Sequence, residues 1–226
     1  MSCYLEGMKR LTLREQLRHV YWIGGGSAAG KSTIARRIAR ERGLRVYATD
    51  DVMADHARRS TTADCPLLHS FLSMDMDDRW VKRSPTTMLE TFHWFQGEGF
   101  SLIIEDLLRL PRNAPTIVEG FRPLPKLVKP LLSQPTQAVW LLPTPKFREA
   151  VVDRRGGASW GFLAKTSDPE RALNNLLERD QMFTDLVRQE TLRLQLPTIE
   201  VDSSLDEDEL TARVTELFDL LRYHQL

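Results

Sequence analysis

The segment with the clearest chemical pattern is glycine-rich and ends in a lysine followed by two hydroxyl residues. Residues 24–33 read GGGSAAGKST, so Gly25, Gly30, Lys31 and Ser32 satisfy the pattern GxxxxGK followed by Ser or Thr. Glycines allow backbone N–H groups to turn inward around phosphate oxygens, and a lysine at this position can reach the outer phosphates. We therefore expect a nucleoside triphosphate site, with the Ser32 hydroxyl as a Mg²⁺ ligand. Its predicted binding residues are Gly25, Gly26, Ser27, Ala28, Ala29, Gly30, Lys31, Ser32 and Thr33.

Five short apolar runs bounded by turn residues predict the strands that must position this loop. They occupy residues 19–24, 44–51, 115–120, 137–143 and 197–202, and helical sequence separates them. Alternating strands and helices give a parallel sheet covered on both faces, because right-handed crossovers place helices there. At 226 residues the chain is expected to be one α/β domain, a three-layer sandwich around a five-stranded parallel sheet.

Three helical segments stand out in the pattern. Residues 52–111 are helical and aromatic, with a turn at residues 97–99, and predict an insertion after the second strand. A long helix is predicted from Asp168 to about Gln195, with Ser167 and Glu170 as a capping box. The last helix, near residues 205–221, is predicted to begin with a box of Ser204 and Glu207.

The motifs GGGSAAGKST, YATDD and IVEG, with the arginines after the fourth predicted strand, resemble the P-loop NTPases. Within them, the chain is similar to the small-molecule and nucleotide kinase branch. The resemblance implies a five-stranded core, a substrate-binding insertion over residues 52–111 and an arginine-bearing lid over about residues 146–170. It also implies ATP and Mg²⁺ as cofactors and a small molecule as acceptor.

Carboxylates at two strand ends are the candidate acid–base and metal groups. By similarity to kinases with an acidic residue here, Asp50 or Asp51 is the base that receives the proton of the acceptor hydroxyl. Neighbours on an extended strand face opposite ways, so only one should reach the site; Asp50 is the first choice and Asp51 the second. The resemblance also makes Asp50 and Glu119 candidate Mg²⁺ ligands, and Glu119 a candidate acceptor contact. The alternatives are that the aspartates only favour a helix start and that Glu119 only ends a strand.

Arginines supply the candidate anion contacts. Arg154 and Arg155 adjoin a pair of glycines and are the candidate lid residues, able to close over ATP and stabilise the transferred phosphoryl group. Arg58 and Arg59 of the insertion, and Arg122 in the loop FRPLP, could contact the acceptor. Arg122, Arg154 and Arg155 could instead be solvated surface charges.

Composition limits the partners. The 31 basic residues balance the 31 acidic residues, which argues against a protein that mainly coats nucleic acid or an anionic membrane. No apolar run approaches the roughly 18 residues of a spanning helix, and the first residues lack the apolar core of a signal peptide. Cys3 and Cys65 are too few for a disulfide framework. We expect a cytoplasmic protein whose partners are ATP and a small-molecule acceptor, and a homodimer stays open.

Three functions are compatible with these patterns. The first is an ATP- and Mg²⁺-dependent phosphotransferase acting on a hydroxyl of a nucleoside, sugar or natural product. The second is a nucleoside monophosphate kinase, which needs several arginines around the acceptor phosphate. The third is an ATP-binding regulatory protein that transfers no phosphoryl group.

Overall fold

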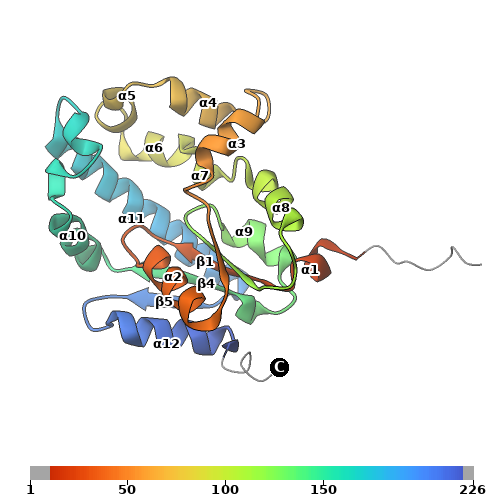
Figure 1. Ribbon diagram of the computed structural model, residues 1–226. Coiled ribbons are helices and arrows are strands. Elements are labelled where there is room, and N and C mark those ends of the chain that lie inside the picture. The colour runs from red at the N-terminus through yellow and green to blue at the C-terminus, as the bar shows by residue number, and fades with distance from the viewer. Residues whose placement is uncertain (1–10, 221–226) are drawn as a thin grey trace, which may run out of the picture.

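The computed structural model describes residues 11–220 and is built on a five-stranded parallel sheet (Figure 1). The strand order is β2-β3-β1-β4-β5, and every pairing is parallel. The strands are β1 (Val20–Gly25), β2 (Arg45–Ala48), β3 (Thr116–Glu119), β4 (Ala138–Pro143) and β5 (Thr198–Val201). Each lies within or beside one of the predicted apolar runs, so the predicted α/β class and five-stranded parallel sheet are confirmed.

Side chains alternate along the strands and fill two separate cores, one on each face of the sheet. On β1, Tyr21 and Ile23 belong to the core beneath α2 (Lys31–Arg42) and α12 (Glu207–Leu217). Trp22 points to the other face, where it joins the core packed under α11 (Pro169–Leu194). In Figure 1 α12 lies on the opposite side of the sheet from α11, and α2 packs with α12 on that face, which gives three layers.

Six helices between β2 and β3 form the predicted insertion. They are α3 (Met53–Arg59), α4 (Pro66–Ser73), α5 (Met76–Trp80), α6 (Pro85–Thr91), α7 (His93–Gln96) and α8 (Phe100–Arg109). Gly97 and Gly99 both adopt positive φ in the turn between α7 and α8, as the glycine pair predicts. The other helical segments are α1 (Leu13–Gln16), α9 (Pro125–Val128), α10 (Pro145–Arg154), η1 (Lys129–Leu131), η2 (Pro135–Gln137), η3 (Gly157–Ser159) and η4 (Leu163–Lys165).

The starts of the two C-terminal helices differ from the prediction. Helix α11 is capped by Asp168, whose side chain accepts from the Arg171 N–H, and not by Ser167. Helix α12 is capped by Asp206 and not by Ser204, whose hydroxyl instead donates to Asp202. Both predicted serine caps are wrong, because an aspartate nearer the helix supplied the carboxylate that its first turn binds.

The glycine-rich loop of residues 25–32 leaves β1 under close contact with β4. Gly25 has a φ of +119°, and a Cβ there would collide with the backbone of Leu141. The Gly26 N–H donates to the Leu141 carbonyl at 3.0 Å. Gly30, at φ +80°, then precedes the first residue of α2, which is Lys31. The loop is thereby fixed above the carboxyl ends of β1 and β4, with Lys31 at a helix N-terminus.

The expectations about membrane spans and cysteines can be compared with the structure only over the described residues. Among residues 11–220 no helix is both long enough and apolar enough to cross a membrane. Cys65 is buried with a free thiol, whereas Cys3 lies outside the described residues, as does the final residue of the predicted last helix.

Candidate functional site

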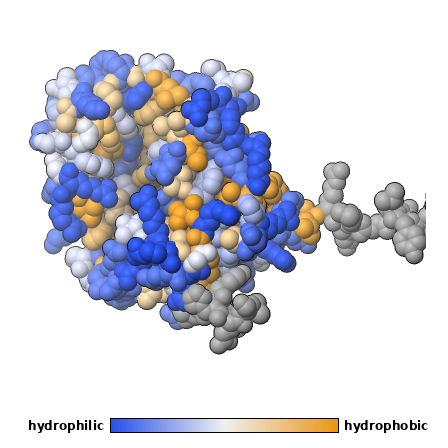
Figure 2. Space-filling view, in the orientation of Figure 1, coloured by the Kyte–Doolittle hydropathy of each residue, from blue (hydrophilic) through white to orange (hydrophobic). Residues whose placement is uncertain are grey.

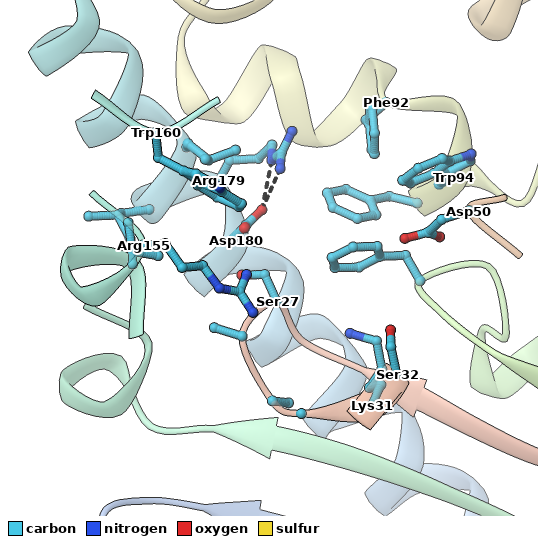
Figure 3. Close-up of a pocket in the computed structure, with 18 of the residues that line it drawn as sticks. Ser27, Lys31, Ser32, Asp50, Phe92, Trp94, Arg155, Trp160, Arg179 and Asp180 are labelled. Atoms are coloured by element: carbon cyan, nitrogen blue, oxygen red, sulfur yellow. Dashed lines mark hydrogen bonds and ion pairs between the residues drawn. The ribbon is translucent and has the colours of Figure 1, made fainter. Parts of the chain in front are cut away.

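Two cavities meet at the glycine-rich loop. The first, of about 320 Å³, lies between the loop, the insertion and α11, and we call it the aromatic cavity (Figure 3). The second, of about 940 Å³, lies between the loop, α10 and the turn from β5 to α12, and we call it the α10/α12 cavity. Figure 2 shows a largely hydrophilic face with apolar residues in several places, among them around a hollow below the insertion. Both cavities are lined by Ala28, Ala29, Gly30, Thr33 and Arg155.

Lys31 is buried at the point where the loop faces the aromatic cavity. Its Nζ donates to the Gly26 carbonyl at 2.5 Å and lies 4.2 Å from the centroid of the Phe121 ring. Burial lowers the pKa of Lys31 to about 8, although the nearby carboxylates of Asp50 and Glu119 oppose this shift. The ammonium group is therefore poorly solvated, and an anion in the loop would be a stronger partner than a carbonyl and a ring face.

Ser32 and Glu119 bring two oxygen ligands together beside the loop. The Ser32 hydroxyl donates to Glu119 Oε2 at 2.9 Å, because β3 lies next to β1 and ends level with the first turn of α2. Burial raises the pKa of Glu119, while the bond from Ser32 and the charge of Lys31 act in the opposite direction.

These two oxygens fit Mg²⁺ bound together with phosphate. Mg²⁺ prefers oxygen ligands and is commonly held by one or two carboxylates with substrate phosphates. Within residues 11–220 no cluster of three His, Cys, Asp or Glu side chains could hold a metal by itself. An ion at Ser32 and Glu119 would therefore need further oxygens from its ligand or from water.

The turn after β2 separates the two candidate aspartates. Asp50 lines the aromatic cavity and receives a hydrogen bond from Thr49 Oγ1 at 3.3 Å (Figure 3). Although Asp50 keeps exposed surface, the protein packed around its carboxylate raises its pKa, with Lys31 opposing. Asp51 is exposed and lines neither cavity. Neither aspartate caps α3, whose N-cap is Val52 without a side-chain bond.

Gly120 holds the end of β3 against that turn. Its φ is +137°, and a Cβ there would overlap the Thr49 hydroxyl. The Thr49 N–H also donates to the Glu119 carbonyl at 2.9 Å. Close backbone contact therefore places Asp50 and Glu119 at the same edge of the sheet.

The two candidate lid arginines occupy different surroundings. Arg155 lines both cavities, and its guanidinium lies 5.2 Å from the centroid of the Trp160 ring. Arg154 lines only the α10/α12 cavity, and its Nε donates to the Ala150 carbonyl at 3.2 Å. Of this pair, Arg155 is the residue that can contact groups in both spaces.

The structure does not bring the other candidate arginines to either cavity. Arg58 is exposed and pairs with Asp55 at 3.2 Å. Arg59 pairs with Asp106 at 2.6 Å. Arg122 is buried and donates to the Gly99 carbonyl at 2.7 Å. In place of the expected acceptor contacts, Arg59 links α3 to α8, Arg122 links the segment after β3 to the insertion, and Arg58 pairs within α3.

A buried ion pair on α11 is the main feature of the site that sequence patterns missed. Arg179 donates through Nε and Nη2 to Asp180 Oδ1 at 2.9 and 2.6 Å, inside the aromatic cavity (Figure 3). The Arg179 guanidinium lies 4.9–5.3 Å from the ring centroids of Trp80, Phe92 and Phe95. The available signal was an aspartate in the apolar stripe of α11 formed by residues 176, 180, 183 and 187.

Comparisons with known proteins assign no family to this chain. No protein-family model matches it, and no curated protein matches it. The solved structure of an uncharacterized protein from Eubacterium ventriosum is similar over 89% of this chain and 98% of that chain, with 15% sequence identity and a TM-score of 0.42.

Proposed function

We propose that this protein is a P-loop-type kinase that transfers the γ-phosphoryl group of ATP to a hydroxyl group of a small molecule. The observation that carries the proposal is the position of Lys31 and of the Ser32–Glu119 pair. They lie at a glycine-rich loop between two cavities, with Asp50 lining one of them. A transfer between two ligands needs such an arrangement, because both must meet at one reacting centre.

The three parts of the ternary complex have separate places. The triphosphate lies in the glycine-rich loop, where backbone N–H groups and Lys31 bind anionic oxygens. The nucleoside occupies the larger α10/α12 cavity, of about 940 Å³. The acceptor occupies the aromatic cavity, which contains Asp50. Arg155 lines both cavities and so can contact the phosphoryl group between them.

Phosphoryl transfer needs a proton acceptor, and Asp50 supplies it. The acceptor oxygen forms a bond to the γ-phosphorus, the bond from that phosphorus to the β–γ bridging oxygen breaks, and ADP leaves with the electron pair. The hydroxyl proton passes to the Asp50 carboxylate. Ser32 and Glu119 would hold Mg²⁺, which would offset negative charge on the phosphates. Lys31 and Arg155 add positive charge from the chain itself.

A hydroxyl acceptor is better supported than a nucleoside monophosphate. The latter requires free arginines around its phosphate, yet Arg58, Arg59 and Arg122 bind acidic or carbonyl groups outside the cavity. Arg83 likewise donates to the Asp78 carbonyl at 3.0 Å. Arg179 lines the cavity but already has Asp180 as its partner.

Calorimetry with ATP and Mg²⁺ tests the nucleotide site. We expect saturable binding that Lys31→Ala weakens by about tenfold or more, because the variant removes a charge at the outer phosphates. Lys126→Ala, at an exposed lysine outside both cavities, is the matched control and should bind as the unaltered protein does. Absence of ATP binding would overturn the proposal.

Transfer itself is measured by ADP release and product detection with a library of alcohols. ATP binding without phosphorylation of any alcohol or monophosphate would instead support a regulatory nucleotide-binding protein. Parallel assays with nucleosides and their monophosphates separate the two kinase functions.

A further inference from the structure

The wall of the aromatic cavity opposite the glycine-rich loop is unusually rich in rings. Seven of the 22 residues that line the whole cavity are aromatic, whereas aromatic residues make up 8% of the chain. The insertion, the segment after β3 and the lid region all contribute rings, so segments distant in sequence converge here (Figure 3). The seven are Trp80, Phe92, Trp94, Phe95, Phe121, Trp160 and Phe162.

The charges that line the cavity balance, and each of its cations already has a carboxylate partner or a proposed role at the triphosphate. Three basic residues face three acidic ones: Lys31, Arg155 and Arg179 against Asp50, Glu119 and Asp180. Lys31 and Arg155 lie toward the loop and the second cavity, where the triphosphate needs them. Arg179 is neutralised by Asp180 at 2.6 Å. A phosphate or carboxylate on the acceptor would therefore meet Asp50 without a compensating charge.

A cationic acceptor is disfavoured because the protein's own cations already face several of the rings. Arg179 lies over Trp80, Phe92 and Phe95, and Lys31 lies over Phe121. Each contact uses one negative face of its ring, so fewer ring faces remain to attract a ligand amine. The charge balance and the ring contacts together favour an uncharged acceptor.

The shape and polarity of the wall favour a flat apolar group over a polyol. Trp94 and Phe121 are nearly parallel, with an interplanar angle of 16° and centroids 5.9 Å apart, and Phe95 packs against Phe121 at 6.0 Å. Aromatic side chains bind further rings by offset-stacked or edge-to-face contact. A sugar needs a hydrogen-bonding partner for each buried hydroxyl, and this wall supplies mainly ring carbons.

We infer, on the basis of the proposed kinase function, that the acceptor is an uncharged molecule with an aromatic ring and a nearby alcohol hydroxyl. The ring packs among Trp94, Phe95 and Phe121, and the hydroxyl reaches Asp50. The volume of about 320 Å³ is at the small end of ligand pockets, which fits one ring system with a short chain. The product is the phosphate monoester of that alcohol and the displaced group is ADP, with the hydroxyl proton taken by Asp50.

Matched acceptor probes test this inference. The probes are 2-phenylethanol and 2-(indol-3-yl)ethanol, their saturated counterpart 2-cyclohexylethanol, glucose, and adenosine monophosphate, each with ATP and Mg²⁺. Phosphorylated products are identified by mass spectrometry. We expect kcat/KM to be about tenfold or more higher for the aromatic alcohols than for 2-cyclohexylethanol and glucose.

Variants at Trp94 test the position of the ring. Trp94→Leu should lower kcat/KM for the aromatic alcohols by about tenfold with little change in ATP affinity, and Trp94→Phe should recover most of it. Thermal unfolding and ATP calorimetry on the same samples show whether the variants are folded. If Trp94→Leu does not fold, the comparison among probes with the unaltered protein decides the question.

The outcomes separate this inference from the proposed function. Phosphorylation of glucose or adenosine monophosphate in preference to every aromatic alcohol would overturn the inference and leave a kinase in place. Failure to bind ATP, or binding with no phosphorylation of any probe or of any member of the alcohol library, would overturn the kinase function and the inference with it. Phosphorylation of library alcohols that lack a ring, with none of the aromatic probes, would overturn the inference alone. Equal kcat/KM for 2-phenylethanol and 2-cyclohexylethanol would show that the wall selects apolar rather than aromatic groups and would also overturn the inference.

Discussion

Replacing Asp50 by Asn gives the sharpest test of the assigned chemistry, because Asp51 next to it provides a matched control. Asp50 lines the aromatic cavity, receives a hydrogen bond from Thr49 and lies within the field of Lys31, whereas Asp51 lines neither cavity. A carboxamide keeps the shape of the side chain but cannot take the hydroxyl proton. General-base catalysis contributes about 10²–10⁴-fold, so kcat for Asp50→Asn should fall by that factor, or about 3–5 kcal/mol in barrier.

ATP affinity should change much less than kcat in Asp50→Asn. Loss of the carboxylate removes repulsion with the triphosphate, but it also removes one of the charges that support protonation of Lys31. Steady-state kinetics at pH 7, with calorimetry of ATP binding, measure the two effects separately. Asp51→Asn should keep kcat within roughly twofold.

The pH profile gives an independent readout of the same group. The protein packed around the Asp50 carboxylate raises its pKa, and a protonated carboxyl cannot act as a base. Activity should therefore rise with pH through a pKa above the ordinary carboxyl value of 3.8, and the acidic limb should change in Asp50→Asn, where Glu119 is the remaining carboxylate of the site with a raised pKa. The reasoning is refuted if Asp51→Asn abolishes turnover while Asp50→Asn keeps it, or if the acidic limb of Asp50→Asn is identical to that of the unaltered protein.

Three other perturbations follow from the same geometry. With a pKa of about 8, Lys31 is about half protonated at pH 8, and a bound triphosphate raises that pKa. ATP binding at pH 8 should therefore take up about half a proton, which calorimetry in buffers of different ionisation enthalpy measures. A binding heat that does not depend on the buffer contradicts this. Arg155→Ala should lower kcat by up to about 10³-fold, while Arg154→Ala changes it by roughly twofold, because only Arg155 lines both cavities. Single-turnover rates measure both effects, and equal losses in the two variants would contradict the role given to Arg155. Gly120→Ala should destabilise the fold by about 3 kcal/mol in thermal or urea unfolding, since its Cβ overlaps Thr49. Gly43 also has positive φ but has open space around it, so Gly43→Ala should destabilise the fold by only about 1 kcal/mol. Similar values for the two variants would show that φ alone decides the loss of stability.

The sheet could be predicted from sequence because its signals are local. Each buried strand is an apolar run followed by turn residues, and the glycine-rich loop marks where β1 gives way to α2. Helix ends were less certain, since several polar residues compete for the same first turn. Asp168 and Asp206, and not Ser167 and Ser204, are the N-caps because they stand directly before their helices.

The composition of the site was less accessible to sequence reasoning, since it depends on long-range contacts. Arg58 and Arg59 are close to Asp50 along the chain, but α3 carries them to Asp55 and Asp106 instead. Strand alternation left Asp50 and Asp51 as alternatives, because the turn that distinguishes them is held by Gly120, which follows β3.

The buried ion pair on α11 also depends on long-range contacts that the sequence does not show. Arg179 and Asp180 could not be assigned to the site until the rings of the insertion were placed around them. A helical period locates the face of a residue but not the element that faces it.

Asn175 joins the insertion to α11 before any ligand enters. Its side-chain amide donates to the carbonyls of Trp80 and Val81 at 3.0 and 3.2 Å, and the Ser167 N–H donates to Asp77 at 2.7 Å. Trp80 and Arg179 therefore have a fixed relation supplied by the chain itself. A preorganised site loses little conformational entropy when a ligand binds. It therefore binds rigid ligands that match its shape more tightly than ligands that require the site to rearrange.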